Sequence, residues 1–177
     1  MYNVLDTELS KLENSTHLKL NSSWKLWFHS PENKSWDIDS YVLVCEIFDI
    51  HGFWNIFTQF TPNQIQYGMF FLMRENIKPT WEDVNNINGG CWSFKVSKKE
   101  TFETWIELCI AAVGEIITNE YIDTLTINGV TISPKKNFSI IKIWNNDKNK
   151  NTTDLLSSNI PNISLDESLY NAHQDKS

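Results

Sequence analysis

The sequence is poor in arginine and cysteine, and it has no long apolar run. Arg74 is the single arginine beside fourteen lysines, and the 177 residues carry a formal net charge of −7. An acidic chain is a poor candidate for tracking long nucleic acids, because affinity for them grows with the number of phosphates neutralised, yet it can hold a single nucleotide. We expect no membrane span and no secretory signal, because the chain has neither a run of about 18 apolar residues nor an apolar segment near its start.

The three cysteines and four histidines form no pattern typical of a catalytic or metal site. An odd number of cysteines without a Cys-x-x-Cys pair argues against a disulfide framework and a zinc site, and indicates a reducing compartment. The sequence contains no His-Glu-x-x-His metalloprotease motif, no Gly-x-Ser-x-Gly nucleophile elbow and no Gly-x-x-x-x-Gly-Lys phosphate loop. We therefore expect a cytoplasmic protein that is not an enzyme and that has no cofactor and no metal ion.

Length and composition favour one globular domain, because 41% of the residues are apolar and 177 residues are too few for two good cores. Residues 1–16 are polar and weakly patterned, which predicts a flexible N-terminal arm. The domain is expected over residues 17–177, with residues 145–164 rich in loops.

Hydrophobic patterns predict strands and two helices. Asp49 is the predicted N-cap of a helix through about residue 59, and Ser97 with Glu100 forms a candidate capping box for a helix through about residue 118, with Ile116 on its buried face. The pair Asn128-Gly129 indicates a hairpin turn. Strands are predicted over 24–28, 41–47, 67–73, 92–96, 124–127 and 140–144. This order indicates one mostly antiparallel sheet with helices on one face, an α+β fold.

Tryptophan is abundant, and two of the rings lie outside any apolar periodicity. Trp36 follows a turn, and Trp81 follows Pro79 and precedes two carboxylates. Since each buried indole N–H needs a partner, some of these rings are expected to contact a ligand, although the pattern leaves open whether Trp36 and Trp81 are structural. The eight tryptophans are Trp24, Trp27, Trp36, Trp54, Trp81, Trp92, Trp105 and Trp144.

Two indoles and a carboxylate suit a flat cationic heterocycle. Stacking contributes roughly 1–3 kcal/mol per ring face, and cation–π attraction adds about 0.5–2 kcal/mol. Glu82 can accept two N–H bonds from a guanine edge. Lys135 and Lys136 can neutralise a few phosphates, or they form a solvated turn. A methylated guanine with a phosphate chain therefore fits this set of groups.

Several of these motifs recur together, in order, in one known family. They include Trp24-Lys-Leu-Trp27-Phe28, Lys78-Pro-Thr-Trp81-Glu82-Asp83, Gly89-Gly90-Cys-Trp92 and Ile143-Trp144. Together they resemble the mRNA cap-binding translation initiation factor 4E family over roughly residues 17–146. All eight tryptophans fall on family tryptophan positions.

The resemblance implies a single curved antiparallel sheet backed by about three helices on its convex face, with 7-methylguanosine bound in the concave face. Trp36 and Trp81 would then sandwich the methylguanine, Glu82 would accept its N1–H and N2–H, and Trp144 would lie near the N7-methyl group. Lys135 and Lys136 would bind phosphate. Tryptophan at both sandwich positions looks like the principal class of the family.

The resemblance also implies a partner site on the convex face, and the helical pattern points the same way. Ile50 and Trp54 form a stripe separate from the buried face of the first helix, and Ile106 and Ile110 widen the apolar arc of the second. With Glu107, these positions would receive a Tyr-x-x-x-x-Leu helix of a scaffold factor 4G or of a 4E-binding protein. Internal packing of Ile106 and Ile110 is the alternative.

The sequence departs from the family at the phosphate pocket. Lys135 falls on the phosphate-binding arginine of the family, but Asn137, Ile140 and Cys91 stand where further basic residues are usual. We expect weaker and less salt-sensitive cap binding than a more basic pocket gives. The His-Pro-Leu motif before the first strand is replaced by the stretch that begins at His17.

The predicted function is recognition of the 5′ cap of mRNA and its recruitment to translation initiation through a scaffold partner, by a monomer that binds neither DNA nor membranes. A cap-binding repressor or decoy that recruits no scaffold is the alternative. A carbohydrate-binding tryptophan platform is a further candidate from another class.

Overall fold

A single sheet of seven strands organises the chain, whose residues 18–176 are described by a computed structural model. The order is β2-β1-β3-β5-β6-β4-β7, and every neighbouring pair is antiparallel. The strands are β1 (Lys19–His29), β2 (Tyr41–Asp49), β3 (Met69–Arg74), β4 (Gly90–Ser97), β5 (Ile127–Pro134), β6 (Phe138–Asn145) and β7 (Leu169–Ala172).

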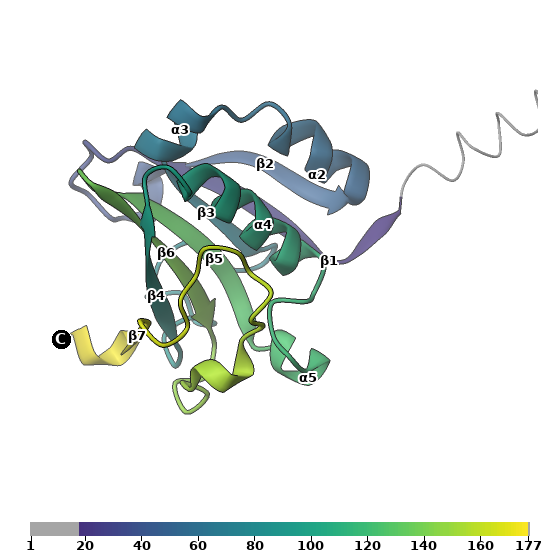
Figure 1. The fold of residues 1–177 in the computed structure, drawn as a ribbon, viewed down its shortest axis with the longest axis vertical. Helices are drawn as coiled ribbons and strands as arrows, with labels where there is room; N and C mark the ends of the chain where they lie inside the picture. The colour runs from purple at the N-terminus through teal and green to yellow at the C-terminus, as the bar shows by residue number, and fades with distance from the viewer. Residues whose placement is uncertain (1–17, 177) are drawn as a thin grey trace, which may run out of the picture.

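Helices cover one face of this sheet, as Figure 1 shows. They are α2 (Ile50–Phe57), α3 (Pro62–Tyr67) and α4 (Thr101–Val113), while α5 (Tyr121–Thr124) is a single turn just before the start of β5. Short 3₁₀ turns occur at Ile38–Ser40, Thr153–Leu155 and His173–Lys176. The predicted α+β architecture, one antiparallel sheet with helices on its convex face, is confirmed.

The main hydrophobic core lies between the sheet and the helices. Alternate strand residues point to the same face, so Ile141 and Ile143 of β6 enter this core together. Trp24 of β1 and Trp105 of α4 are both fully buried there. Each large buried side chain stabilises the fold by about 1.5–3 kcal/mol, so this layer holds the helices on the sheet.

A second, smaller cluster lies on the opposite face of the sheet, which the helices leave uncovered. It includes Tyr41 of β2, Phe71 of β3 and Trp144 of β6, all with less than a tenth of their surface exposed. Its remaining buried members are Met69, Met73, Ile77 and Cys91, with Trp27 and Ile38 packed at its edge. This concave cluster supports the loops that reach over the open face.

The predicted cap of the first helix is confirmed. Asp49 has extended backbone angles, and its carboxylate accepts a hydrogen bond of 2.6 Å from the N–H of Gly52. Such a cap satisfies one of the free N–H groups at the helix start. Phe53 and Phe57 are buried beneath α2, whereas Ile50 and Trp54 are 42% and 44% exposed.

Four sequence predictions about element limits are wrong. The strand predicted from residue 67 begins at Met69, because a capping box formed by Thr61 and Gln64 starts the helix α3, which ends at Tyr67. The helix predicted through residue 118 ends at Val113 and is followed by a residue with φ of 58°, Glu115. Ile116, expected on the buried face, is 61% exposed as a result.

Two further errors concern the start of β5. The strand predicted over 124–127 is wrong, because Tyr121–Thr124 forms α5 and β5 begins at Ile127. The pair predicted to turn, Asn128-Gly129, lies inside β5 and makes no turn. Asn128 is buried, and its amide donates to the Asn85 carbonyl and the Asn86 side chain, both at 2.8 Å. A Cβ atom at Gly129 would lie 2.6 Å from the carbonyl oxygen of Leu72 on β3. Both residues are therefore required by tertiary packing rather than by a local turn.

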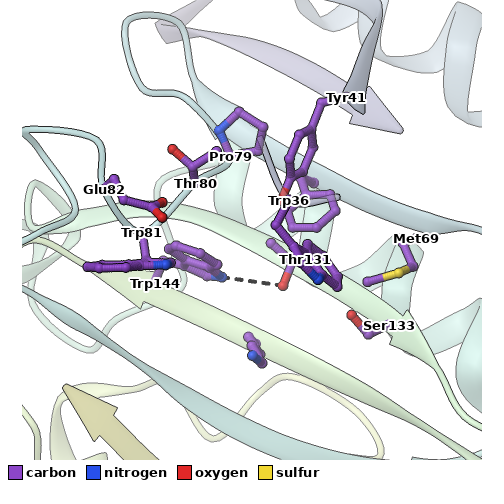
Figure 2. Close-up of a pocket in the computed structure, with 12 residues that line it drawn as sticks. Trp36, Tyr41, Met69, Pro79, Thr80, Trp81, Glu82, Thr131, Ser133 and Trp144 are labelled. Atoms are coloured by element: carbon purple, nitrogen blue, oxygen red, sulfur yellow. Dashed lines mark hydrogen bonds between the residues drawn. The ribbon is translucent and has the colours of Figure 1, made fainter. Parts of the chain in front are cut away.

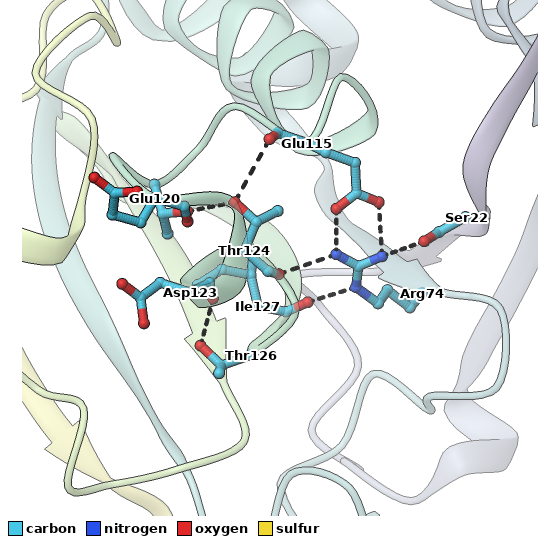
Figure 3. A network of polar contacts seen from close by, with 9 residues as sticks. Ser22, Arg74, Glu115, Glu120, Asp123, Thr124, Thr126 and Ile127 are labelled. Atoms are coloured by element: carbon cyan, nitrogen blue, oxygen red, sulfur yellow. Dashed lines mark hydrogen bonds and ion pairs between the residues drawn. The ribbon is translucent and has the colours of Figure 1, made fainter.

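The single arginine holds the sheet to the end of α4, as Figure 3 shows. Arg74 forms a two-pronged ion pair with Glu115, with N–O distances of 2.9 and 2.8 Å, and donates to the carbonyls of Ile127 and Thr124. Its guanidinium lies 4.8 Å from the centre of the Trp24 ring. The Glu115 side chain is 3% exposed, so its charge depends on this one partner.

We expect Glu115→Gln to lower the free energy of unfolding by about 3 kcal/mol, because it leaves the buried guanidinium without its counter-charge. Urea denaturation measures the change. The matched control is Lys25→Met, which breaks the more exposed Lys25–Glu46 pair and is expected to cost less than about 1 kcal/mol. Equal losses in the two variants would contradict a structural role for the Arg74 network.

Candidate ligand-binding site

A cavity of about 310 Å³ opens on the concave face of the sheet. Figure 2 shows its lining, which two loops and the strands β2, β3, β5 and β6 contribute. Trp36 enters from the loop after β1, and Trp81 with Glu82 enters from the loop between β3 and β4. Trp144 lines the cavity from β6. The structure therefore brings together all four residues predicted to bind the base.

A chain of aromatic contacts positions Trp36. Its ring is stacked on His29 with a centroid separation of 4.5 Å and an interplanar angle of 2°. His29 in turn contacts Tyr41 at 4.8 Å, and Tyr41 meets Phe71 edge-on at 5.2 Å. The half-exposed Trp36 is thus held on the concave cluster through a fully buried histidine.

The backbone of the same loop is held as well. The Nε2 atom of His29 lies 2.8 Å from the carbonyl oxygen of Ser35, and the Ser40 hydroxyl donates to that same oxygen at 3.1 Å. The other ring nitrogen, Nδ1, is buried without a hydrogen-bond partner. Because a carbonyl oxygen only accepts, Nε2 is the donor in this contact, and the ring supports Trp36 from behind.

Buried asparagines position the second loop. Asn86 is fully buried, and its amide donates to the carbonyls of Lys78 and Thr80 at 3.0 and 2.8 Å. Its side-chain oxygen accepts from Asn128 of β5 at 2.8 Å. The Asp83 carboxylate accepts from the N–H of Lys78 at 3.1 Å. The turn that carries Trp81 and Glu82 is therefore closed on both sides.

Trp144 is fixed in the lining of the cavity. It is 7% exposed, and its indole N–H donates to the Thr131 hydroxyl at 3.3 Å. The ring of His173 lies 4.7 Å away. With its N–H satisfied and its edges packed, this ring can offer an apolar contact to a small group such as a methyl.

The cavity has charges of opposite sign on its walls. Glu82 lines one side of the cavity. Burial, and to a smaller extent the negative charge of Glu82, raises the pKa of Tyr41 to about 12. Lys142 lines another part of the cavity from β6. A ligand with a cationic or N–H-donating part and an anionic part would match both walls.

The two lysines predicted to bind phosphate lie elsewhere. Lys135 and Lys136 are exposed in the turn between β5 and β6, and neither lines the cavity. Sequence reasoning also missed His29, Asn86 and Lys142. No local signal marks the first two, but the alternation of Ile141, Lys142 and Ile143 along a strand does place Lys142 on the face opposite the core.

A second, apolar cavity of about 180 Å³ lies on the helical face. The predicted partner residues Ile50, Trp54 and Ile110 line it together with Leu20 and Phe53. Ile106 is half-buried against the main core. Glu107 is exposed and lines a neighbouring cavity that also includes Ile110.

Within residues 18–176, no group of three or more histidine, cysteine or acidic side chains is placed to hold a metal ion. None of the helices in that range has the length and the apolar character needed to cross a bilayer. Burial raises the pKa of the thiols of Cys45 and Cys109, which disfavours their reactive thiolate forms.

Comparison with known proteins gives one consistent result. The model of the family described as "Eukaryotic initiation factor 4E" matches residues 19–177. Eukaryotic translation initiation factor 4E of Candida albicans is 32% identical over 148 residues, a match that covers 78% of this chain and 69% of that protein. The factor 4E-3 of Caenorhabditis elegans is 29% identical over 150 residues, covering 79% of this chain and 58% of that protein.

Solved structures agree with the sequence matches. The complex of C. elegans eIF4E-3 with the 4E-binding protein Mextli and a cap analog superimposes with a TM-score of 0.73 and 27% identity, covering 90% of this chain and 95% of that one. The complex of Ascaris suum eIF4E-3 with the m7G cap has a TM-score of 0.68 and 25% identity, covering 76% and 77%.

The support of Trp36 by His29 can be tested by hydrogen exchange. We expect His29→Ala to speed amide exchange in residues 35–40 by about tenfold or more, because it removes both a ring contact and a hydrogen bond. His29→Phe keeps the ring and is expected to have a smaller effect. Exchange in β4 and β6 serves as the internal control, and unchanged exchange in the alanine variant would contradict this role.

Proposed function

Because the chain belongs to the eukaryotic initiation factor 4E family, we propose that it binds the 7-methylguanosine 5′ cap of mRNA and recruits capped mRNA to translation initiation. The observation that carries the proposal is the cavity of the concave face, where Trp36 and Trp81 from separate loops accompany Glu82 and Trp144. The solved relatives bear the names of cap complexes, which adds support for this ligand.

The proposed pose follows from the chemistry of the methylated base. Methylation at N7 gives guanine a positive charge, so the ring gains cation–π attraction as well as stacking when it lies between Trp36 and Trp81. The Glu82 carboxylate accepts the N1–H and N2–H of the base in a charge-assisted pair. Trp144 contacts the methyl group. An uncharged sugar could also stack on indole and donate hydroxyl groups to the carboxylate, but it would gain no cation–π attraction.

Phosphate contacts belong to the other end of the pose. Lys135 and Lys136 stand in an exposed turn, where their ammonium groups are available to the distal phosphates or to the mRNA that follows the cap. Exposed lysines contribute mainly long-range, salt-dependent attraction. We propose that these two residues act there rather than against the base.

We further propose that the apolar cavity of the helical face receives a helix with a Tyr-x-x-x-x-Leu motif from a scaffold protein of the 4G kind or from a 4E-binding protein. Ile50 and Trp54 present exposed apolar surface that α2 leaves outside the core. Ile110 continues this surface across α4, and Ile106 with Glu107 borders it. Amphipathic helices commonly bind in such grooves.

The remaining parts of the proposal concern the molecule as a whole. We propose a monomeric cytoplasmic protein that binds and does not catalyse, with residues 17–177 as its cap-binding domain. The stretch between β6 and β7 has one 3₁₀ turn as its regular structure, consistent with the expected loops over 145–164. The predicted arm at residues 1–16 lies outside the described residues.

Tryptophan fluorescence tests cap recognition. We expect 7-methyl-GTP to quench the protein far more than GTP does, because only the methylated base is cationic. Trp81→Ala removes one stacking face and should weaken 7-methyl-GTP binding by at least about 1 kcal/mol. Trp54→Ala is the matched control, since it removes an exposed tryptophan from the opposite face. Equal quenching by both nucleotides would refute the cap assignment.

Calorimetry with a peptide that contains the Tyr-x-x-x-x-Leu motif tests the partner site. We expect Trp54→Ala to weaken peptide binding by about 2 kcal/mol or more, the loss typical of a central aromatic contact. Trp81→Ala should bind the peptide like the wild type. If the wild-type protein binds cap but not the peptide, the scaffold role is excluded and a decoy or repressor remains.

A further inference from the structure

Building on the proposed function, we propose that the Lys142 ammonium of β6 is the subsite for the first phosphate of the cap, the one attached to the methylated nucleoside. The ligand class is a 5′-phosphorylated N7-methylguanosine whose first phosphate contributes more to affinity than the later ones. Lys142 is not among the positions at which the resemblance to the family predicts phosphate binding.

The register of the sheet places Lys142 beside the base site. Ile141 and Ile143 of β6 face the main core, so Lys142 and Trp144 share the concave face. Two residues along a strand separate such side chains by roughly 7 Å. Lys142 therefore stands next to the residue proposed to contact the N7-methyl group, at the distance of a nucleoside phosphate rather than of a distal one.

Residues with hydroxyl groups stand opposite Lys142 on both neighbouring strands. Thr131 of β5 and Ser93 of β4 are the cross-strand partners of Lys142. Thr131 lines the same cavity, and because its oxygen accepts the Trp144 N–H, its own hydroxyl proton remains for an acceptor. Ser133 adds a second hydroxyl to the lining. An ammonium with hydroxyl donors is a suitable set for phosphate oxygens.

The charge of Lys142 lacks a carboxylate in the part of the chain that the structure describes. There, Lys150 pairs with Asp123 at 2.7 Å and Lys25 pairs with Glu46 at 3.1 Å, but no ion pair involves Lys142. Lys142 is nevertheless half-buried, and it is the one cationic residue among those that line this cavity. A partly buried cation without a counter-charge is costly, so an anion there gains more than at an exposed lysine.

The exposed turn lysines lie farther along the sheet from Trp144 than Lys142 does. Phe138, where β6 begins, is four residues from Lys142, which corresponds to roughly 13 Å of strand, and Lys136 lies beyond it. Ile140 and Cys91, on the same face, carry no charge. The positive charge of this cavity therefore lies close to the base. We expect the binding affinity to rise steeply with the first phosphate of the ligand and only slightly with each later one.

The test compares 7-methylguanosine with its mono-, di- and triphosphates by tryptophan fluorescence titration. For the wild type we expect the monophosphate to bind about tenfold or more tightly than the nucleoside, and each further phosphate to add less than about threefold. In Lys142→Met, the gain in affinity from nucleoside to monophosphate (the first step) should fall to less than about threefold, while nucleoside binding stays unchanged. Lys142→Arg should restore most of that step.

Lys95→Met is the matched control, because Lys95 lies on the same face of β4, is exposed and does not line the cavity. It changes the net charge of the protein by the same amount and should leave the first step intact. Equal effects of the two methionine variants, or a loss of nucleoside binding in Lys142→Met that matches its loss of monophosphate binding, would overturn the subsite. If the wild-type protein does not distinguish 7-methyl-GTP from GTP, the proposed function is overturned instead, and this inference with it.

Discussion

The binding cavity depends on one asymmetry of the sheet, because helices cover only its convex face. On that side, Trp24, Trp105 and their neighbours form an ordinary core. On the concave side, a small cluster around Tyr41, Phe71 and Trp144 has to support loops without any covering helix. The aromatic contacts from Phe71 through Tyr41 and His29 to Trp36 are the visible result. The exposed ring of Trp36 is thus held in place by buried rings. Its stacking surface is ordered before a ligand binds, which lowers the entropic cost of binding.

Charge is distributed within this cavity in a way that the net charge of −7 does not reveal. Glu82 faces the position proposed for the cationic base, and Lys142 faces the position proposed for phosphate. Lys142 is half-buried, where electrostatic interactions are stronger than in bulk water, whereas Glu82 is exposed at the rim of the cavity. A zwitterionic ligand is therefore matched by two local charges, and a broad basic surface is unnecessary. The same separation disfavours long nucleic acids, which the acidic remainder of the surface repels.

On the helical face, the same elements contribute to the core and to the proposed partner site. In α2, the consecutive residues Phe53 and Trp54 differ in exposure, since Phe53 is 2% exposed and Trp54 is 44% exposed. Phe53 packs in the core at the base of the apolar cavity of the helical face, and Trp54 presents its ring to solvent beside it. Helical geometry turns successive side chains by about 100°, so one short helix serves both purposes. The Arg74–Glu115 network fixes the end of α4, whose residue Ile110 lines the groove. Stability and the partner surface therefore depend partly on the same helices.

Residue patterns and motif spacing predicted the family, the α+β sheet, the Asp49 cap and the four residues that gather at the cavity of the concave face. These features are local or depend on residue order, which a sequence carries directly. The errors arise where distant chain segments decide the outcome. Asn128-Gly129 has the composition of a turn, yet it is strand because Asn86 and β3 pack against it.

By itself, then, the sequence determined which aromatic and acidic residues are present and in what order, and this was enough to predict a ligand of one chemical class. Tertiary structure alone decided which of the lysines line the cavity and which residues hold the loops. Lys142 and His29 owe their places to strand register and to stacking between segments far apart in the chain. Local spacing shows at most the face of a strand on which a residue lies, as it does for Lys142, because the free energy that selects these contacts comes from burial of the whole sheet.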